Sequence, residues 1–223
     1  MYSEPHKQTR VLVLNASART TRSQSRKLAE TFVNHWEILC FDSPIAYREL
    51  GIESVPHINE AWISAAFKPK EQRTEEEVNA LAISDMYIEE LKQADVIVLA
   101  TPMYNWSIPS SLKAYIDQVV RVNETWKLNT ENRQDPYIGL LEGKQVLLLL
   151  TRGSQGYELG GYNENIDFQT NYLKRVFNVI GIQDITVVTI DGEANDPVVY
   201  NTNVEMAHQR VVEFIETKFL FNS

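Results

Sequence analysis

The stretch ADVIVLATPMYNWSIPSSLKAYIDQ, residues 94–118, contains the transitions that decide the fold. Asp95–Ala100 is almost wholly apolar, as in a parallel strand that is covered on both faces. Pro109 suits the first turn of a helix, and apolar residues then recur at helical spacing, at Leu112, Ile116 and Val119. The sequence therefore predicts a buried strand, a loop at 101–109 and a helix.

The same strand pattern occurs at four other places along the chain. These segments are nearly continuous in valine, isoleucine and leucine, and they are Arg10–Asn15, Glu37–Phe41, Lys144–Thr151 and Asp184–Ile190. Five helical patterns lie between and after these strands. The first covers about Ser23–Trp36, the second begins at Thr74 with Glu77 completing a capping box, and the third follows Pro109. The fourth carries apolar residues from Phe168 and ends at Gly181, and the last carries them from Val204 to Phe219. This alternation predicts one α/β domain over residues 1–223, a three-layer, doubly wound, five-stranded parallel sheet, for which the flavodoxin-like order 2-1-3-4-5 is a common solution.

Composition and charge argue against several classes of protein. A net charge of −9 is unsuited to nucleic acid or anionic lipid. The longest purely apolar run, Val146–Leu150, is too short to cross a bilayer, and the polar N-terminus has no apolar core of a signal peptide. Cys40 is the only cysteine, which favours a cytoplasmic location, and we expect it as a core thiol within the second strand.

In such a sheet, ligands bind beyond the carboxyl ends of the strands, near the switch in strand order. The loops at that edge are NASARTTRSQS (15–25), TPMYNWSIP (101–109) and TRGSQGYELGG (151–161). The first is rich in hydroxyls and ends at a helix N-terminus, a combination that suits a phosphate monoester. It lacks the glycine patterns of triphosphate and dinucleotide loops. The alternative is a polar loop that ends in a serine N-cap.

The other two loops supply different chemistry. Tyr104 and Trp106 can lie against a planar heterocycle; the alternative is a ring that staples the next helix to the core. Gly153 and Gly156 permit positive φ and close approach of backbone to a ligand, or they form a flexible connection. A phosphate site, a flat apolar slot and a glycine loop together fit flavin mononucleotide (FMN) better than any other common cofactor.

Four segments of the chain resemble the FMN-dependent NADH-azoreductase family: VLVLNASARTTRSQSRKLAETF (11–32), ATPMYNWSIPSSLKAYIDQVVRVNETW (100–126), LLTRGSQG (149–156) and FNVIGIQDITVVTIDG (177–192). This is a group of dimeric, flavodoxin-fold NAD(P)H:quinone and azo-compound reductases. The similarity runs in order over nearly the whole chain, and its most specific part is P-M-Y-N-aromatic followed by I-P and L-K. The resemblance implies a homodimer in which the second protomer closes each flavin pocket.

The resemblance also implies roles for residues of each loop. The FMN phosphate would be held by Ser17, Ser23, Gln24 and Ser25. The isoalloxazine ring would be lined by Met103, Tyr104, Asn105 and Trp106. The pyrimidine edge of that ring would be met by Thr151, Arg152, Gly153 and Ser154. Two departures are the sequence TRGS, where the family has S-R-G-G, and a longer segment at 127–141. Arg152 is either a ligand contact or a surface charge. Trp126 is either a gate over the substrate or packing at a helix end.

A bound flavin explains why the sequence contains no catalytic triad, because the cofactor carries the difficult step. The histidines lack the spacing of ligands, so we expect no metal. We expect NADH or NADPH to pass hydride to flavin N5 and leave, and a quinone or azo compound then to accept two electrons in the same place. Backbone N–H groups of the third loop would stabilise the negative charge of the reduced flavin. Two rivals are a single-electron carrier of flavodoxin type and an interaction module without cofactor.

Overall fold

The central feature of the computed structural model, which describes residues 8–40 and 42–220, is a five-stranded parallel sheet. The polar N-terminal residues 1–7, and the end of the predicted second strand at Phe41, lie outside the described residues. The sheet has the order β2-β1-β3-β6-β7, which is the predicted 2-1-3-4-5. Its strands are β1 Val11–Asn15, β2 Ile45–Arg48, β3 Val96–Pro102, β6 Gln145–Arg152 and β7 Asp184–Asp191.

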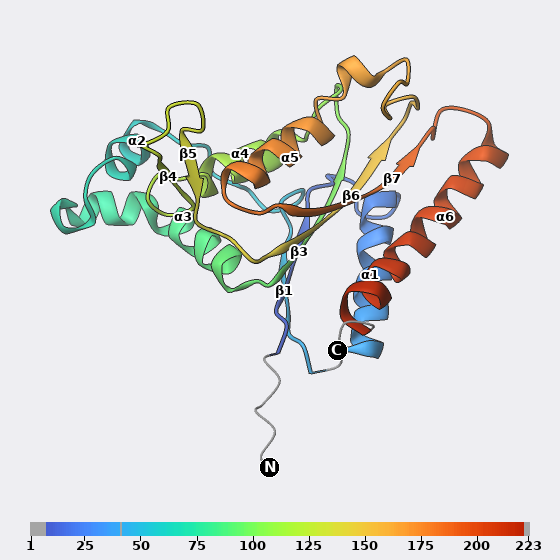
Figure 1. Cartoon of the computed structure of the whole chain (residues 1–223), viewed down its shortest axis with the longest axis horizontal. Helices are drawn as coiled ribbons and strands as arrows, with labels where there is room; N and C mark the ends of the chain where they lie inside the picture. The colour runs from blue at the N-terminus through green and yellow to red at the C-terminus, as the bar shows by residue number, and fades with distance from the viewer. Residues whose placement is uncertain (1–7, 41, 221–223) are drawn as a thin grey trace, which may run out of the picture.

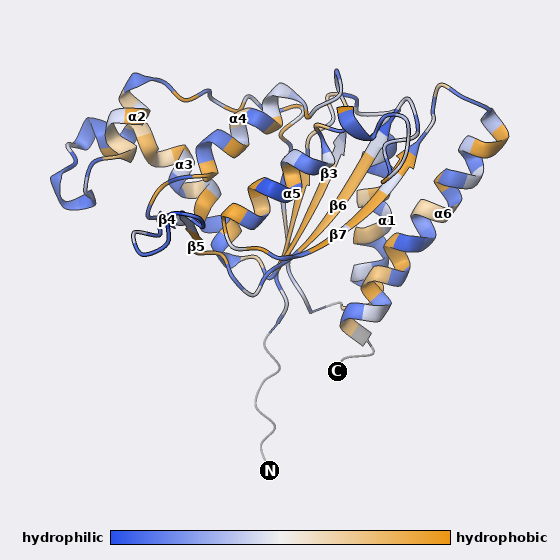
Figure 2. Cartoon of the chain, turned by 45° about the horizontal axis from the view of Figure 1, so that its top comes forward, coloured by the Kyte–Doolittle hydropathy of each residue, from blue (hydrophilic) through white to orange (hydrophobic). Residues whose placement is uncertain are grey.

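Helices cover both faces of the sheet, which confirms the three-layer prediction (Figure 1). One face carries α1 (Gln24–Leu39) and α6 (Pro197–Ile215), and the other carries α3 (Glu75–Gln93), α4 (Ser110–Val119) and α5 (Thr170–Val179). Alternate strand residues enter two separate cores, so that Leu12 and Leu14 pack on the α3–α5 side and Val11 and Val13 on the α1–α6 side. The middle parts of the inner strands are therefore almost wholly apolar (Figure 2).

The second strand is where the sequence-based prediction was wrong. Residues 37–39 belong to α1, and Cys40 ends that helix by donating its N–H to the Trp36 carbonyl oxygen at 2.7 Å. The apolar residues of this segment do not indicate a buried strand, because Ile38 faces solvent with 74% of its surface exposed. Cys40 is thus a half-buried helix cap and not a core thiol in mid-strand, and burial raises its pKa. The actual edge strand, β2, has the weakly apolar sequence IAYR.

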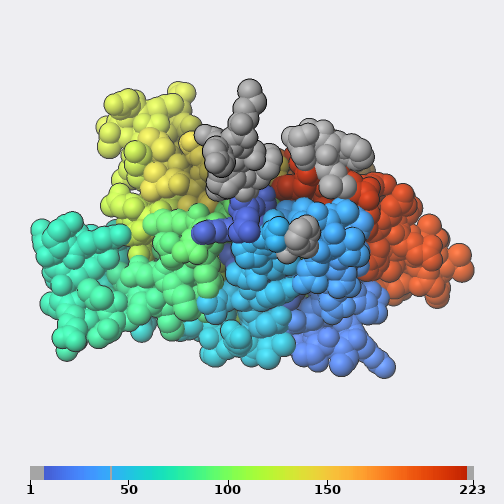
Figure 3. Space-filling model, turned by 90° about the horizontal axis from the view of Figure 1, so that it is seen from below, coloured from blue at the N-terminus to red at the C-terminus, as the bar shows by residue number. Residues whose placement is uncertain are grey.

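An antiparallel hairpin, β4 (Trp126–Leu128) and β5 (Tyr137–Gly139), is inserted between α4 and β6. Most of the 127–141 segment forms this hairpin. In the view from below, the hairpin (yellow-green) and the α2–α3 region (teal to green) lie at one end of the molecule and α6 (orange to red) at the other (Figure 3). The remaining short elements are α2 (Glu60–Ala66), η1 (Lys70–Gln72), η2 (Glu164–Ile166) and the π-helical turn η3 (Glu216–Leu220).

Local signals set the helix ends as predicted. Thr74 and Glu77 form the expected capping box of α3, and Gly181 follows α5 with a φ of 105°, a conformation that glycine adopts at little cost. Asn59 caps the short helix α2, because its side chain accepts a hydrogen bond from the Trp62 N–H. Among the described residues, none of the helices has both the length and the apolar character required to cross a membrane.

A buried carboxylate, Glu124, joins three elements beside the hairpin. It is 6% exposed and forms ion pairs with Lys70 of η1 at 2.6 Å, Lys92 of α3 at 2.9 Å and Arg121 at 3.4 Å. Burial alone would raise the pKa of Glu124, but hydrogen bonds from Lys70 and Lys92 outweigh it and lower the pKa from the usual 4.5 to about 2. The charged form of Glu124 therefore stabilises the packing of η1, α3 and α4.

We expect Glu124→Gln to lower the free energy of unfolding at pH 7 by about 1–3 kcal/mol, the range for hydrogen bonds to a charged group. Because the folded pKa lies below the unfolded value, this stabilisation is present above pH 4.5 and is lost as the pH falls towards 2. Urea unfolding at pH 7 and pH 3 measures it, with the exposed Glu131→Gln as control. A difference between wild type and Glu124→Gln that stays constant with pH would contradict the assignment.

Candidate functional site

A hollow of about 220 Å³ opens at the carboxyl edge of the sheet, and all three predicted loops line it. The loop after β1 contributes Ser17, Ser23 and Gln24, the loop after β3 contributes Met103 and Tyr104, and the loop after β6 contributes Thr151, Arg152 and Gly153. In-register pairing explains the convergence, because Asn15 pairs with Ala100, and Pro102 with Thr151, so the strands end level with one another. The predicted meeting of the three loops at one hollow is therefore confirmed.

The first loop is built to receive an anion. Ser23 is the N-cap of α1 and accepts a hydrogen bond from the Arg26 backbone N–H at 3.3 Å, so the helix dipole points its positive end at this loop. Arg19 and Arg22 also line the hollow. Both arginines lie within the predicted loop 15–25, but they were not among its predicted ligand-binding residues. Their position just before a helix N-terminus, where anions bind, could have indicated them.

Ser25 is the one member of the predicted phosphate-binding group that lies outside the lining of the hollow. Its side chain is fully buried and does not line the hollow. Its hydroxyl lies 3.1 Å from the Ser23 hydroxyl, so that the two share a hydrogen bond. Ser25 therefore supports the orientation of Ser23 from behind.

The second loop is a tight turn that holds an aromatic residue in solvent. Tyr104 and Ser107 exchange backbone hydrogen bonds of 2.9 and 3.0 Å, and the two central residues, Asn105 and Trp106, have φ values of 48° and 64°. A bulky residue with positive φ is unusual and strained. Trp106 is 55% exposed, so it does not staple a helix to the core. Asn105 and Trp106 lie at the tip of the turn, outside the lining of the hollow, whereas Met103 and Tyr104 form part of it.

The third loop is oriented by its backbone carbonyls. The carbonyl oxygens of Arg152 and Ser154 accept hydrogen bonds from the Gly192 N–H at 3.1 and 3.0 Å. The Gly153 carbonyl oxygen accepts one from the Ala194 N–H at 2.9 Å. In a planar trans peptide the N–H points opposite to the C=O, so the N–H groups of Gly153 and Ser154 point away from the end of β7. The loop can therefore offer two adjacent donors to a ligand.

The two glycines of this loop serve different purposes. Gly156 has a φ of 83°, as predicted, and packs so closely on the Tyr162 ring that an added Cβ would lie 2.6 Å from it. Gly153 does not have a left-handed φ, and an added Cβ would meet no atom within 4 Å. The fold itself therefore does not require glycine at 153.

Arg152 is buried, and the alternative of a surface charge is wrong. Its guanidinium forms an ion pair with Asp167 at 3.2 Å and with Asp191 at 3.6 Å, donates to Thr170 and lies 4.9 Å from the centre of the Tyr157 ring. The side chain thus anchors the third loop to α5 and β7.

Ser154, the departure from the family pattern, also has a partner within the protein. Its hydroxyl accepts a hydrogen bond from the Asn163 side-chain amide at 3.3 Å. The hydroxyl is engaged with the 157–163 segment, and Ser154 is not among the residues that line the hollow.

The structure places Trp126 in β4, away from the 220 Å³ hollow. Its ring meets that of Tyr137 edge-on, with centroids 5.3 Å apart. Together with residues of α5 it lines a separate apolar hollow of about 320 Å³. Within one chain, Trp126 and the three loops therefore do not form a common site.

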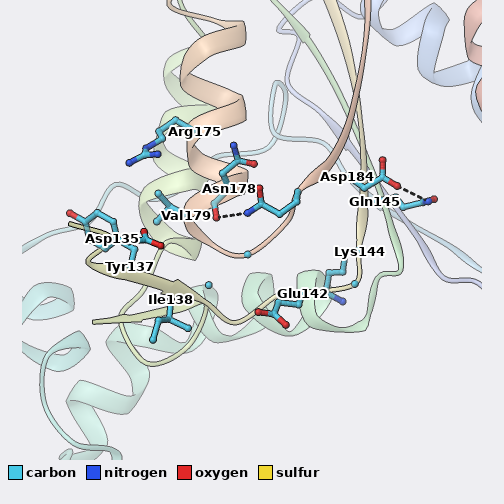
Figure 4. Close-up of a pocket in the computed structure, with 14 residues that line it drawn as sticks. Asp135, Tyr137, Ile138, Glu142, Lys144, Gln145, Arg175, Asn178, Val179 and Asp184 are labelled. Atoms are coloured by element: carbon cyan, nitrogen blue, oxygen red, sulfur yellow. Dashed lines mark hydrogen bonds between the residues drawn. The ribbon is translucent and has the colours of Figure 1, made fainter. Parts of the chain in front are cut away.

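A larger hollow, about 810 Å³, lies at the amino ends of β6 and β7 (Figure 4). Some of its polar side chains already have partners within the protein. Gln183 donates to the Asn178 backbone carbonyl at 3.4 Å and Gln145 donates to the Asp184 carboxylate at 3.0 Å. Lys144 donates to backbone carbonyls. Ligands of parallel sheets bind at the opposite edge, so the smaller hollow is the better candidate.

Residues at the end of β7 and beyond it also belong to the lining, and none of them was predicted from the sequence. Ile190, Glu193 and Tyr200 line the hollow. Asp191 lies beside them, and burial, together with Glu158 and Asp167, raises its pKa to about 6 against the opposing effect of Arg152. The predicted strand order could have identified this segment, because the last strand ends next to β6.

The comparisons with known proteins agree with this geometry. Residues 9–215 match the family described as "Flavodoxin-like fold". A Trichormus variabilis protein named "FMN-dependent NADH:quinone oxidoreductase 1" is 42% identical over 209 residues, which are 93% of this chain and 96% of that protein. A Pseudomonas aeruginosa protein named "FMN-dependent NAD(P)H:quinone oxidoreductase 1" is 38% identical over 205 residues, 92% of this chain and 97% of that protein.

Solved structures are similar over the same range. An FMN-dependent NADH-azoreductase from Bacillus anthracis, in complex with FMN, superposes with a TM-score of 0.80 at 26% identity, covering 93% of this chain and 99% of that one. A second azoreductase structure from Bacillus anthracis has a TM-score of 0.85 at 25% identity, covering 94% of this chain and 100% of that one.

We expect Asp191→Asn to flatten the pH dependence of stability. Because the folded pKa of about 6 lies above the ordinary 3.8, wild type loses stability as the pH rises through this window, by up to about 3 kcal/mol. The asparagine variant lacks this titration. Urea unfolding at pH 4 and pH 7.5 measures the difference, with the exposed neighbour Glu193→Gln as control. An unchanged pH dependence in Asp191→Asn would show that another group titrates.

Proposed function

The chain belongs to the flavodoxin-like family, in the group of FMN-dependent NADH:quinone oxidoreductases and azoreductases, and we propose that it uses NAD(P)H to reduce quinones and azo compounds with FMN as cofactor. We propose further that residues 1–223 form one FMN-binding domain, which the match over 9–215 supports. The observation that carries the function is that the hydroxyl-rich first loop, Met103 and Tyr104 of the second loop and Gly153 of the third line one hollow.

The residues present fit the chemistry of FMN. A phosphate monoester carries negative charge and needs many donors, and the first loop offers Ser17, Ser23, Gln24, two arginines and the N-terminus of α1. We assign Ser25 to the same subsite through its hydrogen bond to Ser23. Both arginines add positive charge that the hydroxyls alone would not provide.

We assign the ring system to the remaining two loops. Met103 and Tyr104 would line the isoalloxazine, with Asn105 and Trp106 of the exposed turn extending that surface. Thr151, Gly153 and Ser154 would meet the pyrimidine edge, the last two through their backbone N–H groups. Arg152 would contribute its backbone, because its guanidinium is committed to Asp167 and Asp191.

FMN, when bound, supplies hydride acceptance and release at its N5 atom. The chain then has three tasks: to hold the phosphate, to lay the ring flat beside Tyr104, and to stabilise developing negative charge with the N–H groups of Gly153 and Ser154. Since one hollow serves this edge, NAD(P)H and the acceptor would use it in turn, which is a ping-pong order.

We also propose a homodimer in the cytoplasm. The hollow of about 220 Å³ is smaller than the roughly 300–1,000 Å³ of typical ligand pockets, which suggests completion by a second surface. Large apolar side chains of the turn and of the 157–168 segment are exposed, namely Trp106, Leu159, Tyr162 and Phe168. A lone, unpaired cysteine supports a reducing compartment.

Neither rival is favoured by the relatives, whose names describe oxidoreductases that depend on FMN. A single-electron carrier would oxidise almost no NAD(P)H with a quinone in the steady state, and an interaction module would remain colourless when mixed with FMN.

Visible absorption spectra test the proposed function. We expect the purified protein to be yellow, and anaerobic addition of NADH or NADPH to bleach the flavin bands, which a quinone then restores. The comparison of the two nucleotides also determines the preferred donor. If neither nucleotide bleaches a bound flavin, the protein is not this reductase.

Gly153→Ala tests the assignment of the third loop. The added methyl group meets no protein atom within 4 Å, so the melting temperature should be unchanged or slightly raised. The methyl would occupy space beside the ring, so FMN affinity should fall on the order of tenfold. Isothermal titration and thermal denaturation measure the two effects. Wild-type affinity in Gly153→Ala would place the pyrimidine edge elsewhere.

A further inference from the structure

A buried arginine, Arg26, lies behind the first loop on the side away from the hollow. It is 9% exposed, and it does not line the 220 Å³ hollow. It lines instead a separate hollow of about 260 Å³ that it shares with Asn15 and Glu49. A buried guanidinium outside the site requires a structural reason, since burial of an unpaired charge is costly.

The Arg26 side chain binds the loop through two backbone carbonyls. Its Nη2 donates to the Ser17 oxygen at 2.9 Å and its Nε donates to the Arg19 oxygen at 2.9 Å. Its Nη1 pairs with a Glu49 carboxylate oxygen at 2.5 Å. The other Glu49 oxygen accepts from the Asn15 side-chain amide at 2.7 Å. The guanidinium is thus fixed at one end by β1 and the segment after β2, and it holds the loop at the other.

The segment 49–51 supports the loop from the same side. The Gly51 N–H donates to the Asn15 carbonyl at 3.0 Å. Its Cα lies so close to the loop that an added Cβ would be 2.0 Å from the Ser17 carbonyl oxygen. The Ser17 carbonyl is therefore confined between Arg26 and Gly51.

This arrangement determines where the loop amides point. Because N–H and C=O are opposed across a trans peptide, the N–H groups of Ala18 and Thr20 point away from Arg26. Ser17 and Arg19 line the hollow, whereas Arg26 does not. A loop without this restraint could turn a carbonyl towards a bound anion, which would repel it.

We infer that Arg26, held by Glu49, is a positioning residue that directs the Ala18 and Thr20 N–H groups towards a bound phosphate and gives the site its preference for a phosphorylated flavin over riboflavin. The inference rests on the proposed function. FMN and riboflavin differ only in the phosphate. The inference adds to the proposed function that Arg26, a side chain that does not line the hollow, determines the preference for FMN over riboflavin.

Equilibrium dialysis of the full-length protein against FMN and against riboflavin tests this role. In Arg26→Gln the two carbonyl bonds from a charged donor are lost, so FMN should bind roughly 10- to 100-fold more weakly. Riboflavin, which has no phosphate to place, should bind within about twofold of wild type. A merely structural role would weaken both flavins equally.

Two further variants separate geometry from charge. Arg26→Lys keeps the charge but cannot reach both carbonyls and Glu49 with a planar fork, so its FMN affinity should fall nearly as far as in Arg26→Gln. Lys27→Gln removes an exposed positive charge from the same turn of α1 and should leave both affinities within about twofold. If Arg26→Gln does not fold because Glu49 is left unpaired, the double variant Arg26→Gln/Glu49→Gln replaces it.

The outcomes distinguish the inference from the function on which it rests. A selective loss of FMN affinity supports the inference. Equal losses for FMN and riboflavin, or wild-type FMN binding in Arg26→Lys, overturn it while the protein remains a flavoprotein. Failure of the wild type to bind either flavin overturns the proposed function, and this inference with it.

Discussion

The level ending of the parallel strands is the constraint on which the rest of the structure depends. Asn15, Ala100, Leu149 and Val188 lie in one row across β1, β3, β6 and β7, so the loops that follow these strands leave the sheet at one edge. The register is held by two apolar cores, one on each face, because a shift by one residue would exchange the side chains between them. Packing of the interior therefore also assembles the site.

At that edge the protein controls the direction of backbone dipoles more than it supplies reactive side chains. The carbonyls of Arg152, Gly153 and Ser154 are bound by the N–H groups of residues 192 and 194, and those of Ser17 and Arg19 are bound by Arg26. In both loops these carbonyls face donors of the protein, so the N–H group of each of these peptides lies on the opposite side. Such preorganised donors favour a negatively charged guest without reorganising when it arrives.

Much of the fold could be predicted because its signals are local. Buried strands in a row of valine, isoleucine and leucine, the Thr74–Glu77 capping box and Gly181 after α5 are each readable within a few residues. The edge strand β2 could not be predicted in this way, because an edge strand needs little apolar character. The apolar residue Ile38 instead led to a strand being predicted at 37–41, although Ile38 faces solvent. Arg152 was ambiguous for a similar reason: its burial depends on Asp167 and Asp191, which are distant along the chain.

The amino-acid sequence by itself determined the alternation of strands and helices, the three loops with their hydroxyl, aromatic and glycine chemistry, and the resemblance to flavin-dependent reductases. Only the tertiary structure decided which members of each loop reach the hollow, that Ser25 supports Ser23 from behind it, and that the Arg152 guanidinium pairs with Asp167 and Asp191. It also decided that Arg26 and Gly51 confine the Ser17 carbonyl. The physical reason is that residue type and spacing carry local conformation, whereas the direction of a buried side chain or a peptide dipole depends on partners that folding brings from elsewhere in the chain.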